Sequence, residues 1–124
     1  MEFSGADGVM IGRGAYGRPW WPGHIAECLK ANSGKAAPTL AMALGILLKQ
    51  QDDTLELYGS MLGNKTFRKH LGWTIVRLKE CGAIDEATQT RLRASLLSEK
   101  SNERVATAMR VLFADCVQQE SLAA

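Results

Sequence analysis

The glycine-rich turn at residues 12–14 has the residue types best suited to binding a phosphate group. Gly12 and Gly14 flank Arg13, and the apolar run at residues 8–11 comes directly before them. The run predicts a short β-strand that ends in this turn. Backbone N–H groups at such a strand end, together with a guanidinium, favour an anionic ligand. The turn is therefore a candidate phosphate site, in which Gly14 is expected to allow close approach.

Two alternative interpretations of these glycines remain open. Gly12, Gly14 and Gly17 match the pattern G-x-G-x-x-G of dinucleotide-binding folds, which requires a long helix directly afterwards and an acidic residue about twenty positions on. Residues 18–22 (RPWWP) interrupt any such helix, and residues 32–34 (NSG) are typical of a linker. The second alternative is a purely structural turn. The joint occurrence of strand, glycines, arginine and Pro-Trp pair favours the phosphate interpretation.

A second candidate surface is basic and falls on a helix expected after residue 64. At about 100° per residue, one sector of this helix gathers Lys65, Arg68, Lys69, Gly72 and Lys79, with His70, Trp73 and Arg77 on its flank. Gly72 would leave room for a phosphate backbone, so a nucleic-acid contact is one interpretation of the stripe. From these residues alone, a solvated charged face is the favoured interpretation. His70 also has the alternative of a core or capping histidine.

Helical periodicity predicts the elements that position these residues. A long helix is expected over residues 39–62, followed by a stop and an N-cap at Gly63 and Asn64 and a second helix that ends at Gly82. Asp85 predicts the N-cap of a third helix, and a fourth is expected from residue 101 or 102. The inward stripes expected for the four helices are Leu40, Leu44, Leu47, Leu48, Leu55, Tyr58 and Leu62; Phe67, Leu71, Ile75 and Leu78; Leu92, Leu96 and Leu97; Val105, Ala108, Met109, Leu112, Phe113 and Cys116.

Composition sets the broad class. The chain has 124 residues, of which 46% are hydrophobic, and this composition predicts a globular fold. Its net charge of +2 does not distinguish a nucleic-acid-binding protein from other proteins. Cys28, Cys81 and Cys116 are far apart and favour reduced, mostly buried thiols over a disulfide framework or a metal site. No leader and no membrane-spanning run are evident, so a cytoplasmic location is expected.

Two longer runs resemble one enzyme family. The run SGADGVMIGRGAYGRPWW at residues 4–21 closely resembles the eighth strand and following loop of the flavin-dependent tRNA-dihydrouridine synthases. The run RKHLGW at residues 68–73 is similar to a segment of their helical C-terminal domain, particularly in the bacterial branch once described as nitrogen-regulation proteins. The resemblance covers essentially the whole chain. Two departures are Thr74, where an aromatic residue is usual, and Arg18, where many relatives have Asn.

The resemblance implies a mainly α chain with three parts. Residues 1–30 would be the last strand and helix of an FMN-binding TIM (β/α)8 barrel, residues 31–37 a linker, and residues 38–124 a helical bundle domain that binds tRNA. Residues 38–124 are expected to fold autonomously, whereas residues 1–30 either pack against them or self-associate with another copy. The family's implied sites are Gly12, Arg13 and Gly14 for the FMN phosphate, and Lys65, Arg68, Lys69, His70 and Arg77 for tRNA.

The reaction implied for the family is reduction of a uridine in tRNA, with FMN passing hydride from NADPH and a cysteine supplying the proton. In the family that cysteine precedes the matching segment, so no catalytic residue is assigned and this chain alone is expected to be inactive. Two alternatives of other classes remain. One is a free-standing helical RNA-binding module. The other is a helical protein-interaction domain that docks through Trp20, Trp21 and Leu29.

Overall fold

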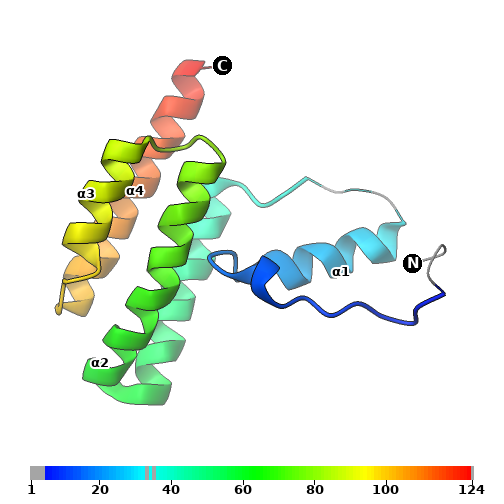
Figure 1. Ribbon diagram of the computed structural model, residues 1–124, viewed down its shortest axis with the longest axis horizontal. Coiled ribbons are helices and arrows are strands. Elements are labelled where there is room, and N and C mark those ends of the chain that lie inside the picture. Colours follow the sequence, from blue (N-terminus) through cyan, green and yellow to red (C-terminus); the bar gives the residue numbers. More distant parts are fainter. Residues whose placement is uncertain (1–4, 33, 35, 124) are drawn as a thin grey trace.

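The chain forms a helical bundle with a smaller N-terminal segment docked on its side (Figure 1). The structure is a computed structural model that describes residues 5–32, 34 and 36–123, with side chains to residue 118. Its elements are listed in order as follows: a short 3-10 helix η1 (Arg13–Ala15), α1 (Trp21–Ala31), α2 (Leu40–Glu80), α3 (Glu86–Leu96) and α4 (Asn102–Ala123). No helix in the described part of the chain has the length and apolar character needed to cross a bilayer.

Helix α2 consists of two antiparallel arms that meet at Gly59 (Figure 1). Gly59 has φ 82° and ψ 175°, a conformation that only glycine adopts without strain. The predicted break at Gly63 and Asn64 is therefore wrong. Gly63 is instead buried where the arms touch, because a Cβ there would lie 2.9 Å from the Cα of Leu55. The glycine serves close packing of the arms, not helix termination.

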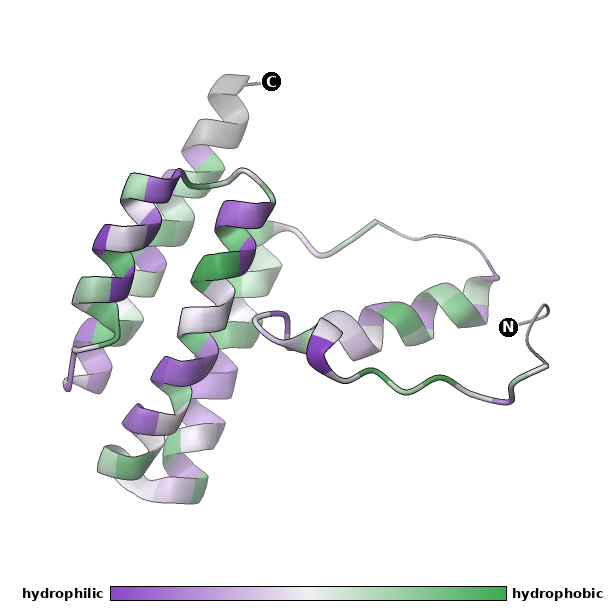
Figure 2. Cartoon of the chain, in the orientation of Figure 1, coloured by the Kyte–Doolittle hydropathy of each residue, from purple (hydrophilic) through white to green (hydrophobic). Residues whose placement is uncertain are grey.

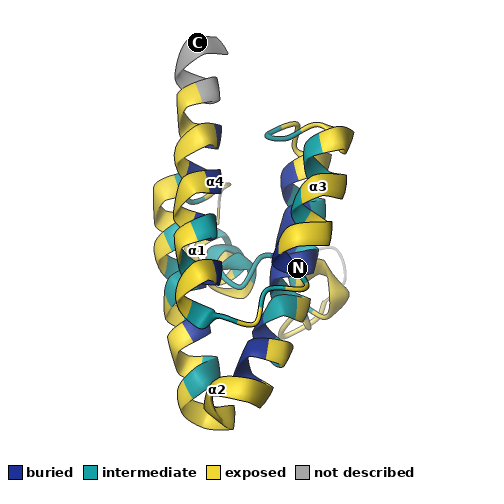
Figure 3. Cartoon of the chain, turned by 90° about the vertical axis from the view of Figure 1, so that its left-hand side faces the viewer, coloured by how far each residue is buried: buried dark blue, intermediate teal, exposed yellow. Residues whose placement is uncertain are grey.

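The core is formed by both arms of α2 together with α3 and α4 (Figure 3). The inward stripe predicted for the second arm is confirmed, since Phe67, Leu71, Ile75 and Leu78 are all buried. Most of the stripe of α4 is also buried: Val105, Met109, Leu112, Phe113 and Cys116. Hydrophobic and hydrophilic residues alternate along the helices of the bundle (Figure 2). Burial of the apolar side chains is the main stabilising contribution to the bundle.

Tyr58 and Leu62 depart from the predicted first stripe, because they are 49% and 55% exposed. Both flank the bend at Gly59, where the chain turns away from the core. Two other expectations, the N-cap of α3 and the glycine after α2, are confirmed. Asp85 caps α3 by accepting a hydrogen bond of 2.7 Å from the Thr88 backbone N–H, and Gly82, with φ 82°, directly follows the end of α2.

Asn102 joins the two arms of α2 to the start of α4. Its backbone carbonyl accepts from Gln51 Nε2 at 3.0 Å, and its side-chain Oδ1 accepts from Asn64 Nδ2 at 2.8 Å. Its own amide nitrogen donates to the Ser60 carbonyl at 3.3 Å. Gln51 and Asn64 are both buried, so these hydrogen bonds remove a desolvation cost that would otherwise oppose folding. The bend of α2 is therefore fixed by side chains as well as by Gly59.

The strand predicted at residues 8–11 does not form, and the described residues contain no strand at all. A strand needs a neighbour to pair its backbone groups, and no described segment lies beside these residues as a ladder partner. Helix α1 likewise has no buried residue. The expectation of a mainly helical chain is confirmed, whereas the arrangement as the end of a barrel stays a prediction.

Candidate functional site

The glycine-rich loop docks on the second arm of α2. Tyr16 stacks on Trp73 with the ring centroids 4.1 Å apart and the planes 10° from parallel. Next to this stack, the buried Thr74 hydroxyl lies 3.2 Å from the Gly17 carbonyl and 3.2 Å from the His70 carbonyl, both of which can accept its hydrogen bond. Thr74 is thus a docking residue for the loop.

Gly17 makes this docking sterically possible. Its φ is +73°, and a Cβ at this position would lie 2.5 Å from the carbonyl carbon of Trp73. Such a distance is a backbone clash, so any side chain at residue 17 would separate the loop from the helix. A Cβ on Gly12 or Gly14 would meet nothing within 4 Å. Close packing of the loop on α2 therefore depends on Gly17, whereas the close approach of a phosphate ligand expected at Gly14 stays a prediction.

Two guanidinium groups bind the loop carbonyls, one from α2 and one from the loop itself. Arg77 Nε donates to the Tyr16 carbonyl at 3.0 Å, and its Nη2 reaches the Gly14 carbonyl at 3.4 Å. Arg18 Nη2 donates to the same Gly14 carbonyl at 2.7 Å. Burial, followed by repulsion from Arg77, lowers the pKa of Arg18. The Arg13 side chain, by contrast, is exposed and makes no hydrogen bond or ion pair with the described residues.

His70 lies beneath this loop. It lines a small hollow of about 180 Å³ together with Gly12, Thr74 and Gln50, and its ring meets Trp73 edge-on with centroids 5.2 Å apart. Burial, with a smaller contribution from Lys69, lowers the pKa of His70. The neutral imidazole is therefore favoured, which is unsuitable for holding a phosphate by charge.

The basic groove lies between α2 and α3 and has a volume of about 350 Å³. We define it by the residues that line it: Lys65, Arg68, Lys69, Gly72, Trp73, Arg93 and Leu97. Four of these are cations, and none of the described lining residues is acidic. Lys69 Nζ also lies 5.4 Å from the centroid of the Trp73 ring, within range of a cation–π contact. This arrangement suits a polyanion.

Arg68 is fixed at the centre of the basic groove. Its Nη1 donates to the Leu97 carbonyl, near the end of α3. Its Nε is buried without a partner among the described residues, an arrangement that costs stability and so favours a role in binding. The notch expected at Gly72 is partly filled, because a Cβ there would lie 3.4 Å from Leu97 Cδ2.

The structure thus separates the predicted basic residues into two groups. Lys65, Arg68 and Lys69 line the basic groove. His70 and Arg77 contact the glycine-rich loop instead. Arg93 completes the basic groove but was missed by the sequence analysis, because helical periodicity shows only residues on one helix and Arg93 comes from α3. Gly12, Arg13 and Gly14 remain together on the exposed loop.

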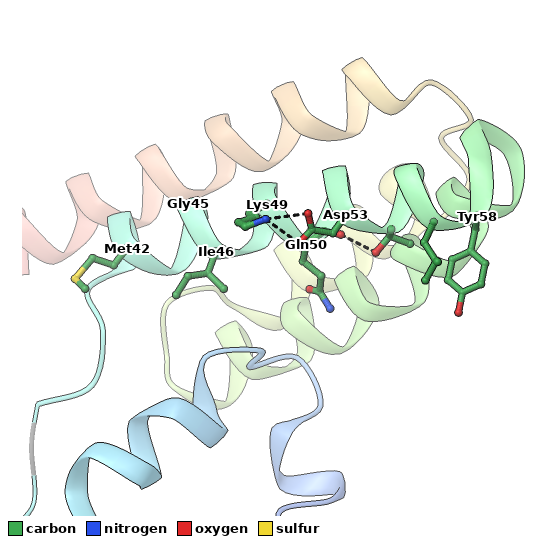
Figure 4. A pocket seen from close by; sticks show the side chains of 9 residues that line it. Met42, Gly45, Ile46, Lys49, Gln50, Asp53 and Tyr58 are labelled. Atoms are coloured by element: carbon green, nitrogen blue, oxygen red, sulfur yellow. Dashed lines mark hydrogen bonds and ion pairs between the residues drawn. The ribbon is translucent and has the colours of Figure 1, made fainter. Parts of the chain in front are cut away.

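Another large hollow lies on the first arm of α2 (Figure 4). Its volume is about 630 Å³, and Met42, Ile46 and Leu57 supply apolar walls. Its only charged lining residues are Lys49 and Asp53, which form an ion pair of 2.9 Å. Because these charges neutralise each other, this hollow lacks the positive potential that a phosphate ligand needs.

Comparison with known proteins adds independent information. A family model described as dihydrouridine synthase matches residues 1–112. The chain is 44% identical over 73 residues to a probable tRNA-dihydrouridine synthase of Rickettsia conorii, a match that covers 59% of this chain and 22% of that protein. It is 34% identical over 106 residues to a probable tRNA-dihydrouridine synthase of Rhodobacter capsulatus, covering 81% and 33% respectively.

A third relative is the tRNA-dihydrouridine synthase B of Shewanella oneidensis, with 32% identity over 94 residues that cover 76% of this chain and 26% of that protein. Across these three relatives the matched part is between 22% and 33% of the relative's length. No solved structure gives a significant match.

Proposed function

The chain belongs to the dihydrouridine synthase family, and from this premise we propose that it forms the C-terminal part of an enzyme that reduces uridine to dihydrouridine in tRNA. Its own contribution is to bind the tRNA substrate through the basic groove. The observation that carries this proposal is the convergence of Lys65, Arg68, Lys69 and Arg93 on one hollow without an acidic neighbour. Cations so placed neutralise backbone phosphates and favour recognition of RNA by shape.

The proposed second contribution is to a flavin site. Arg13 is exposed and makes no hydrogen bond or ion pair with the described residues, and Gly12 and Gly14 leave open space beside it, so the loop fits the phosphate end of FMN. When bound, FMN would supply hydride obtained from NADPH. In this proposal His70 and Arg77 hold the loop against α2 and do not contact tRNA. No residue of the chain is given a catalytic role.

The division into parts follows the same proposal. Residues 1–30 would complete a flavin-binding barrel, and residues 38–124 would be the tRNA-binding domain. Residues 31–37 would be the linker between them. A free-standing RNA-binding module would use the same basic groove. The docking of the glycine-rich loop on α2 favours the first function, because an RNA-binding module alone gives no reason to hold an exposed Arg13 loop against the bundle.

Charge reversal in the basic groove tests the proposal. The double variant Lys65→Glu/Lys69→Glu should weaken tRNA binding by this chain more than tenfold in a filter-binding or anisotropy assay. The matched control, Arg104→Glu/Arg110→Glu, changes the net charge equally on exposed positions of α4 and should bind nearly as wild type. Circular dichroism checks that all variants remain helical. Equal losses in both double variants would contradict a localised tRNA site.

A further inference from the structure

A second hollow continues directly from the basic groove. It has a volume of about 480 Å³ and lies between the bend of α2 and the start of α4. Lys65 and Arg68 line both hollows, so the two share a wall. Lys100, from the segment before α4, also lines the second hollow. The positive surface therefore extends past the residues of α2 and α3 that define the basic groove.

The charges around this second hollow all have one sign. Lys65, Arg68 and Lys100 line it, and none of the described residues around it carries a carboxylate. Glu99 and Glu103 adjoin the lining in sequence, and both bind Ser101: Glu99 Oε1 accepts from its backbone N–H at 3.0 Å, and Glu103 Oε2 accepts from its hydroxyl at 3.2 Å. The three cations are thus available to an anionic ligand.

The same hollow has an exposed apolar wall. Met61 and Leu62 follow the bend of α2 and are 87% and 55% exposed. The wall is held in place by Asn102, which bonds to the Ser60 carbonyl and to the buried Asn64 side chain. A rigid apolar surface beside a cluster of cations matches a ligand with a flat apolar part and a phosphate.

We propose that this second hollow is a binding site for one unpaired nucleotide of the RNA held in the basic groove, an inference that rests on the proposed tRNA-binding function. Lys100, with Lys65 and Arg68, binds the nucleotide's phosphate, while its base packs on Met61 and Leu62. The volume lies within the roughly 300–1,000 Å³ usual for small-ligand sites. Bases of unpaired nucleotides are commonly recognised by packing on side chains.

The apolar wall (Met61 and Leu62) and Lys100 can be tested separately by their effects on tRNA binding by this chain. Met61→Ser/Leu62→Ser should weaken binding about tenfold and leave its salt dependence unchanged, because apolar contacts release no counterions. Lys100→Gln should weaken binding and reduce the slope of log K against log salt by about one. Matched controls are Met42→Ser/Leu57→Ser and Lys30→Gln, which are exposed on other surfaces and should bind as wild type.

Several outcomes would overturn the nucleotide site. If Lys100→Gln weakens binding but the Met61/Leu62 variant matches its control, the hollow is a phosphate contact only. If neither variant differs from its control while Lys65→Glu/Lys69→Glu still abolishes binding, the second hollow takes no part and the proposed function stands. If the Lys65/Lys69 variant also binds normally, the tRNA-binding function itself fails. All of the variants change exposed residues, and circular dichroism verifies their folding.

Discussion

Tyr16 and Trp73 stack face to face, 4.1 Å between ring centroids, and thereby join the glycine-rich loop to the basic groove. Trp73 lines the groove, whereas Tyr16 lies two residues beyond the proposed phosphate-binding glycines. The two candidate sites therefore share one aromatic contact. Any change that separates these rings should affect the loop first, since the bundle core does not depend on Tyr16.

Replacing Gly17 by alanine should undock the loop. The new Cβ would meet the Trp73 carbonyl group at 2.5 Å, and the positive φ adds strain. We expect a loss of more than about 1 kcal/mol in the free energy of unfolding, together with loss of hydrogen-exchange protection in residues 15–18. Gly14→Ala is the control, because its Cβ meets nothing within 4 Å. Unchanged protection in Gly17→Ala would show that the loop does not pack as described.

The hydrogen bonds of Asn102 predict the cost of losing Asn64. Asn64→Ala leaves the half-buried Oδ1 of Asn102 without its donor, so the free energy of unfolding should fall by about 1 kcal/mol. Chemical denaturation measures this change. Ser98→Ala serves as the control, since it removes a hydroxyl whose hydrogen bond is exposed and should be nearly neutral. A neutral Asn64→Ala would mean that the bend of α2 needs no polar support.

The division of the chain predicts unequal local stability. Helix α1 buries no residue, whereas the second arm of α2 supplies Phe67, Leu71 and Ile75 to the core. Backbone amides of α1 should therefore exchange through local openings of much lower free energy than those of the second arm. Native-state hydrogen exchange resolves both helices. Equal protection in the two would contradict autonomous folding of residues 38–124.

His70 should make stability depend on pH. Its pKa is lowered in the folded state, so below about pH 6.5 the unfolded chain takes up a proton that the folded chain resists. The free energy of unfolding should therefore fall as the pH is lowered from 7 to 5, and this contribution should vanish above pH 7. His70→Gln should lose part of that dependence. Parallel stability curves for wild type and variant would exclude the effect.

The sequence predicted the helices better than their connections. Apolar spacing identified the buried face of the second arm of α2 and of α4, because burial is what fixes those positions. The bend was misplaced, since a Gly-Asn pair is a usual stop signal and nothing local distinguishes Gly59 from Gly63. Only the packing of one arm on the other makes Gly63 necessary within the helix.

The candidate site was likewise predicted only where it is local. Lys65, Arg68 and Lys69 recur on one face of one helix, so periodicity groups them. Arg93 joins them through the packing of α3 on α2, and Arg77 reaches the loop through tertiary contact. Neither relationship leaves a signal in the spacing of residues. The strand expected at residues 8–11 failed because pairing depends on a neighbour as well as on the run itself.

The salt dependence of tRNA binding tests the central claim most directly, since counterion release counts the phosphates that the basic groove contacts. The slope of log K against log salt should be smaller in magnitude by about two for Lys65→Gln/Lys69→Gln than for wild type. The control Arg104→Gln/Arg110→Gln should keep the wild-type slope. If the two double variants show the same slope, the cations of the basic groove do not contact the RNA, and the account of this surface is contradicted.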